Sequence, residues 1–152
     1  MIKGRSNTTL YNKCIYRFNG PLLFLNTERF QKNALKCYKA KFSRLYSIKT
    51  KKLEVDPCSE NYYLIVDAST ITDIDQAGVT AIKALNEEII KLNGVLMIAE
   101  CSRAVREECH RAGLSNVLLS SSFYPTIQDA IANASLKEAE KRKSDCLCND
   151  KF

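Results

Sequence analysis

The chain has 152 residues, of which 45% are hydrophobic and 26% are charged, a composition typical of a soluble globular domain. No apolar run approaches the roughly 20 residues that a membrane-spanning helix needs. The first residues also lack the apolar segment of a secretory signal. We therefore expect one soluble, unexported domain.

The net charge of +6 is distributed unevenly along the chain. Residues 1–52 contain 13 Lys and Arg residues and one acid, whereas residues 53–152 contain 10 basic and 16 acidic residues. The basic segment is compatible with contact to anionic lipid headgroups or to an acidic partner, and equally with a solvated helix face and a lysine-rich linker. Its basic residues are not interleaved with an aromatic platform, so we expect no nucleic-acid binding.

The first predicted elements form a hairpin after a flexible segment, residues 1–11. Alternating apolar and polar residues predict a strand at Cys14–Phe18. Asn19-Gly20-Pro21 predicts a turn, and the apolar run Leu22–Leu25 predicts the returning strand.

A long amphipathic helix is predicted next. Asn26 and Thr27 are capping residues for a helix that begins near Glu28. Apolar residues recur every 3.6 positions and leave a lysine-rich outer face: Phe30, Ala34, Leu35, Tyr38, Phe42 and Leu45. The pattern lapses from about Ser47 to Asn61, where we expect a loop.

The centre of the chain alternates between strands and helices. Tyr62–Asp67 is almost entirely apolar, which predicts a strand buried on both faces. A helix closed by Asn93-Gly94 follows, with Ala77, Ala81, Ile82, Leu85, Ile89 and Leu92 on its apolar face. Val95–Ala99 predicts another buried strand.

The last third predicts two more helices around a short strand. Ser102 caps a helix with Val105 and Cys109 facing inward, and Gly113 ends it. Val117–Leu119 predicts an edge strand. Pro125 or Thr126 then opens a helix with the apolar residues Ile127, Ala130, Ile131 and Ala134.

The element order ββαβαβαβα predicts an α/β fold with a mixed β-sheet and helices packed mainly on one face. We assign residues 12–136 to this single domain. Residues 137–152 form a charged tail that we predict to be disordered.

The seven cysteines are odd in number and irregularly spaced. Four fall within predicted strands or helices, where a free cysteine behaves as a small hydrophobe: Cys14, Cys37, Cys101 and Cys109. Without an export signal we expect thiols rather than disulfides. Only Cys146 and Cys148 lie close together, and with no second ligand pair nearby we predict no metal site.

The residues after the central strand are the main candidates for a functional site. Asp67 ends the strand, and Asp73 and Asp75 lie in a polar loop before the next helix, where α/β proteins place ligand or partner sites. Asp75 is placed to cap that helix, and Gly78 permits either the close approach of a partner or tight packing within the domain. The three acids could also bind Mg²⁺, although no glycine-rich phosphate loop accompanies them.

A cysteine nucleophile is not supported by the pattern. His110 is the only histidine, and it points about 100° away from its neighbour Cys109 around the predicted helix. We therefore predict no catalytic residues and no cofactor.

Four motifs in register resemble the STAS domain, shared by bacterial anti-sigma-factor antagonists and SulP anion transporters. The central motif is VDASTITDIDQAGVTAIKAL, and it is accompanied by IYRFNGPLLFLNTERF, SRAVREECHRAGL and FYPTIQDAI. The resemblance covers roughly residues 12–135 and is closest to the transporter version. It implies a non-enzymatic domain on the cytoplasmic side of a sulfate or other anion transporter, acting in regulation, folding or trafficking through protein contacts.

The resemblance also implies a partner-facing loop, made of Asp73, Ile74, Asp75, Gln76, Ala77 and Gly78. Antagonists carry a phosphorylated serine at the position of Ala77, so that switch is not available here. The alternative to a transporter domain is a stand-alone cytosolic adaptor without this serine. Weak nucleotide binding at the helix start is a further hypothesis, although Asp73 and Asp75 would oppose an anion.

Overall fold

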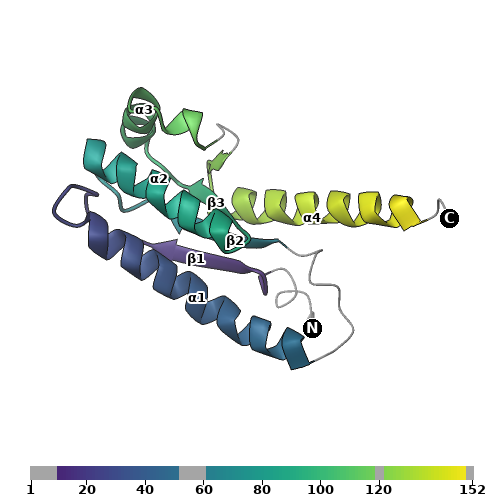
Figure 1. Cartoon of the computed structure of the whole chain (residues 1–152). Coiled ribbons are helices and arrows are strands. Elements are labelled where there is room, and N and C mark those ends of the chain that lie inside the picture. The colour runs from purple at the N-terminus through teal and green to yellow at the C-terminus, as the bar shows by residue number, and fades with distance from the viewer. Residues whose placement is uncertain (1–9, 52–60, 119–121, 150–152) are drawn as a thin grey trace, which may run out of the picture.

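The structure is a computed structural model that describes residues 10–51, 61–118 and 122–149, with side chains described to residue 43 in the first helix and to residue 144 in the last. Its centre is a parallel sheet with the strand order β1 (Lys13–Arg17), β2 (Tyr62–Asp67), β3 (Gly94–Ala99) and β4 (Phe123–Tyr124) (Figure 1). Parallel neighbours require crossover connections, and helices supply them.

In the part of the chain that the structure describes, four α-helices cover this sheet: α1 (Thr27–Lys51), α2 (Gln76–Lys91), α3 (Arg103–Arg111) and α4 (Ile127–Asn149). Figure 1 shows α1 and α2 side by side, and the two helices pack against each other. Side-chain oxygens begin two of the helices as predicted, since Asp75 accepts from the amide of Gly78 and Ser102 from that of Val105. The predicted α/β fold is confirmed.

The sheet separates two apolar cores of different size. Helices α1, α2 and α3 cover one face with large side chains, among them Phe30, Leu85 and Ile89. Helix α4 covers the other face with Ala130 and Ala134. Strand β2 contributes to both cores, which explains why every one of its residues is buried.

The predicted hairpin strand at Leu22–Leu25 is wrong. Only Leu22 makes a strand-like contact, an isolated parallel bridge to Ile74. The following residues form a tight turn in which Asn26 accepts from the amide of Leu23 at 2.9 Å and donates to the carbonyl of Pro21 at 2.7 Å. The side chain of Asn26 thus takes the backbone groups that a hairpin ladder would need, and the described strands are all parallel.

The predicted edge strand at Val117–Leu119 is also wrong over the residues that are described. Gly113 has a positive φ of 79° and starts a short 3-10 helix, η1 (Leu114–Asn116). The amides of Val117 and Leu118 both donate to the carbonyl of Leu114, which keeps the backbone coiled. The edge strand is β4 instead, paired with Ile98 and Ala99 of β3, and Leu119 lies outside the described residues.

Two helices extend beyond their predicted ends. Helix α1 continues from Ser47 to Lys51, into the segment predicted as a loop, because no Gly or Pro interrupts it there. Helix α4 includes residues 137–149, so the predicted boundary at residue 136 is not the end of a structural element. None of the described helices combines the length and the apolarity needed to cross a membrane.

Candidate functional site

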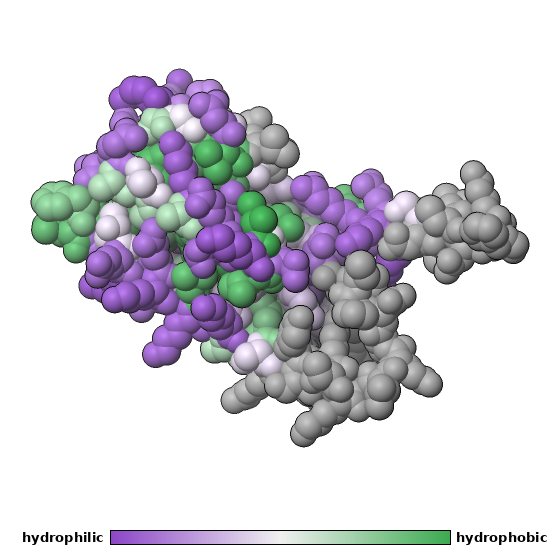
Figure 2. Space-filling model, in the orientation of Figure 1, coloured by the Kyte–Doolittle hydropathy of each residue, from purple (hydrophilic) through white to green (hydrophobic). Residues whose placement is uncertain are grey.

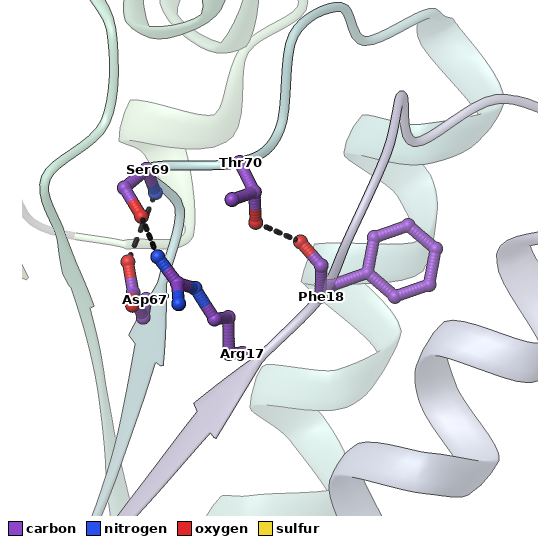
Figure 3. Close-up of polar contacts among 5 residues, drawn as sticks. All are labelled: Arg17, Phe18, Asp67, Ser69 and Thr70. Carbon is purple, nitrogen blue, oxygen red and sulfur yellow. Dashed lines mark hydrogen bonds and ion pairs between the residues drawn. The ribbon is translucent and has the colours of Figure 1, made fainter.

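The carboxyl end of β2 is joined to the end of β1 by a buried carboxylate. Asp67 lies opposite Arg17 in the sheet, and its Oδ2 is 3.3 Å from the Arg17 Nε (Figure 3). Its Oδ1 accepts from the amide of Ser69 at 3.0 Å, and Arg17 also donates to the Ser69 hydroxyl at 3.2 Å. Thr70 donates to the carbonyl of Phe18 at 2.6 Å. These bonds hold the start of the β2–α2 loop against the end of β1.

The second half of this loop is held by the turn between β1 and α1. The amide of Leu22 donates to the carbonyl of Asp73 at 2.9 Å, and the amide of Asp75 donates to the carbonyl of Leu22 at 3.3 Å. Ile74 is buried between these two bonds. These two backbone bonds attach the second half of the loop to the β1–α1 turn.

Asp75 joins the two segments through its side chain. Its Oδ1 accepts from the amide of Gly78 at 2.7 Å, which is the predicted cap of α2. Its Oδ2 accepts from the amide of Phe24 at 3.0 Å, in the neighbouring turn. The carboxylate thus occupies one of the amides at the helix start that a phosphate would need.

Gly78 is required by the packing of the chain on itself. A Cβ at this position would lie 2.3 Å from the carbonyl oxygen of Leu22 and 2.7 Å from the Cγ1 of Ile74. Of the two roles that the sequence left open for Gly78, the structure therefore favours tight packing within the domain.

The six predicted site residues are brought together, but they differ in exposure. Asp73 and Gln76 are exposed, Asp75 and Ala77 are half-buried, and Ile74 and Gly78 are buried. The exposed members could contact a partner directly, whereas the buried ones shape the loop. A docking role for this loop remains a prediction.

Sequence reasoning missed two residues beside this loop, Phe24 and Leu25, which we call the apolar tip. Their relative exposures are 68% and 81%. Figure 2 shows an apolar projection where Figure 1 places the β1–α1 turn. The available signal was the run of four apolar residues after Asn19-Gly20-Pro21, which was assigned to a strand.

The acidic residues of the loop are engaged separately by protein groups. Asp67 pairs with Arg17, Asp75 caps α2, and Asp73 accepts from the amide of Ile74 at 2.9 Å. Among the residues that the structure describes, no group of three or more His, Cys, Asp and Glu side chains is placed to hold a metal ion. The arrangement gives no support to the Mg²⁺ alternative.

Cys109 and His110 behave as expected from their helical spacing. Cys109 is buried and His110 is exposed. Burial raises the pKa of the Cys109 thiol to about 12, which disfavours the thiolate that a nucleophile needs.

Comparison with known proteins supports the resemblance. A family model described as STAS domain matches residues 2–130. The chain is 32% identical over 80 residues, 53% of its length, to High affinity sulfate transporter 2 of Stylosanthes hamata, and the match spans 12% of that transporter.

Two solved structures illustrate the fold. A sulfate transporter family protein from Wolinella succinogenes superposes with a TM-score of 0.60 at 21% identity, covering 85% of this chain and 88% of that one. A Thermotoga maritima protein described as a candidate anti-sigma factor antagonist gives a TM-score of 0.56 at 15% identity, covering 82% and 88%. At these identities the likeness concerns the fold alone.

Proposed function

Because the chain belongs to the STAS domain family, we propose that it is a non-catalytic regulatory domain that acts by binding a protein partner. The partner is the membrane domain of a SulP-like sulfate or anion transporter, and the site of action is the cytoplasmic face of the membrane. The similarity to a sulfate transporter supports this choice. The proposed docking surface consists of the exposed residues of the 73–78 loop and the apolar tip.

The observation that supports this surface most directly is the bond between the Phe24 amide and Asp75. It ties the apolar tip to the loop at the start of α2, so two segments that are 51 residues apart in the chain form one surface. Four further hydrogen bonds stiffen the turn, from the amides of Leu23 and Asn26, the Asn26 side chain and the Thr27 hydroxyl. A rigid surface loses little conformational entropy on binding.

The composition of the surface favours a protein as its partner. Two large exposed apolar side chains can enter a pocket and lose their contact with water, and such anchors dominate the affinity of many interfaces. Asp73 and Gln76 provide a polar rim beside them.

Serine phosphorylation at the start of α2 does not regulate this surface, because Ala77 has no hydroxyl. Thr80 lies one helical turn into α2, and its hydroxyl donates to the carbonyl of Gln76 at 2.9 Å. The stand-alone adaptor remains the alternative function, supported by the fold shared with the Thermotoga protein.

Photocrosslinking in the producing cells tests the proposal. The full gene product carries p-benzoyl-phenylalanine at Gln76 in one form and at Ile90, an exposed residue far along α2, in a control form. We expect only the Gln76 form to crosslink to the membrane domain of an anion transporter, in the same polypeptide or in another one. A soluble signalling protein as the crosslinked species would support the adaptor alternative instead.

A second variant tests whether the apolar tip belongs to the surface. Phe24→Ser with Leu25→Ser should lower the crosslinking yield from Gln76 about tenfold or more, since each anchor is worth about 2 kcal/mol or more. Ile90→Ser is the matched control and should leave the yield unchanged. An unchanged yield in the tip variant, with thermal melts showing that it is folded, would remove the tip from the docking surface.

A further inference from the structure

Two thiols face each other across the contact between β1 and α1. The Sγ of Cys14 lies 3.2 Å from the Sγ of Cys37, close enough for one thiol to donate a hydrogen bond to the other. Both cysteines are free. We propose that Cys14 and Cys37 are an oxidation site, which a peroxide converts into a disulfide.

The geometry demands little movement. A disulfide has a sulfur–sulfur distance of about 2.05 Å, so the two atoms must approach by about 1.2 Å. Side-chain rotation with a small shift of α1 relative to β1 can supply this. The packing of Phe30 and Tyr38, on the same face of α1, already holds the two elements together.

The two thiols have different environments, which sets the order of reaction. Cys14 is only 2% exposed, whereas Cys37 is partly exposed on α1. Burial, and next the hydrogen bond with Cys37, raise the pKa of Cys14 to about 12. Cys37 is therefore the thiol that meets the oxidant.

The reaction has two balanced steps. The Cys37 thiolate attacks one oxygen of hydrogen peroxide, so that an S–O bond forms, the O–O bond breaks and hydroxide leaves; sulfur is oxidised and the peroxide is reduced. The Cys14 sulfur then attacks the sulfenic sulfur of Cys37. The S–S bond forms, the S–O bond breaks, and the Cys14 proton leaves with the hydroxyl group as water.

The disulfide would close a ring that contains the apolar tip. Residues 15–36, between the two cysteines, include the end of β1, the whole turn and the first part of α1. If the docking surface exists as proposed, oxidation would restrain one half of it. The chemistry of the thiol pair does not depend on that proposal and is tested separately.

The experiment uses the full chain with Cys58, Cys146 and Cys148 replaced by serine, to limit competing disulfides. The protein is treated with hydrogen peroxide, alkylated and digested with trypsin without reduction. Cleavage after Lys13, Arg17, Lys36 and Lys39 releases the peptides CIYR and CYK. We expect these two peptides linked, with a mass two hydrogens below their sum, and separated again by dithiothreitol.

A matched variant and a stability measurement complete the test. The Cys37→Ser variant should give no linked peptide. Its Cys14 should stay a free thiol through the peroxide treatment and should therefore be recovered in alkylated form. In the protein that retains both Cys14 and Cys37, oxidation should raise the Tm by about 6–12 °C. This is the value expected for a disulfide that closes a loop of this size in a chain of this length. Recovery of both peptides unlinked after peroxide, or of Cys37 as a sulfinic acid with Cys14 still free, would overturn the proposal.

Discussion

The two faces of the sheet are covered in different ways. On one face, α1, α2 and α3 enclose large side chains such as Phe30, which is fully buried. On the other, α4 lies close to the strands because Ala130 and Ala134 face them. Beyond these alanines the second interface becomes polar, with Asn12 donating to Glu138 of α4 and accepting from the Lys13 ammonium at 3.1 Å.

The difference indicates that the two faces have different tasks. Burial of large apolar side chains supplies most of the stabilisation, so the face with three helices should dominate the free energy of folding. The fully buried residues of α4 are the small Ala130 and Ala134. Beside this helix, burial lowers the pKa of Lys13, and the nearby Glu138 counters that cost only in part. We therefore expect α4 to detach more easily than α1 or α2.

The largest effect should come from the face with three helices. Phe30→Ala removes a ring that packs against Phe18 at 5.4 Å and Tyr16 at 5.9 Å between centroids. We expect a loss of about 3–5 kcal/mol in the free energy of unfolding, measured by urea denaturation. Phe24→Ala is the control, because this exposed ring should contribute less than about 0.5 kcal/mol. Similar losses in both variants would contradict the assignment of the main core.

A smaller effect is expected at the face covered by α4. Ala134→Leu adds three carbons where the helix lies against the sheet, and we expect about 1–3 kcal/mol of destabilisation from overpacking. Ala132→Leu, on the exposed side of the same helix, should change the stability by less than about 0.5 kcal/mol. Amide hydrogen exchange should show the loss of protection in Ala134→Leu concentrated in α4. Uniform loss across the domain would mean that the two faces unfold together.

The smallest effect is expected from Tyr63→Phe, on the same face. The Tyr63 hydroxyl is buried, which raises its pKa, and among the described residues only the Asn61 side chain opposes that rise, without a hydrogen bond of normal distance and angle. Removing it should leave the free energy of unfolding unchanged or raise it by up to about 1 kcal/mol, since a buried polar group without a partner is costly. A loss of more than about 1 kcal/mol would show that this hydroxyl is satisfied in solution.

Local patterns predicted the elements that have strong local signals. The 3.6-residue spacing of Phe30, Ala34, Tyr38 and Phe42 predicted α1, and the apolar run of β2 predicted a fully buried strand. Asp75 and Ser102 were identified as caps because a cap needs only a side-chain oxygen at the right offset. These features depend on neighbours within about one turn.

The errors in the strand predictions fall where short apolar runs have the composition of strands. Leu22–Leu25 and Val117–Leu119 have the composition of strands. The bonds of Asn26 decide the backbone of the first run, and the left-handed Gly113 starts the coil that continues through Val117 and Leu118. The apolar tip was missed for the same reason. A strand of apolar residues is expected to be buried, whereas a turn can direct the same residues into water.

The sequence by itself determined the family, the alternation of strands and helices and the position of the acidic loop, because these follow from periodicity and short motifs. Only the tertiary structure decided what the loop is joined to. The Leu22 carbonyl lies in the space where a Cβ of residue 78 would stand, and the Phe24 amide binds Asp75 from 51 residues away. Contacts between distant segments depend on how the helices pack on the sheet, and no local pattern records that packing.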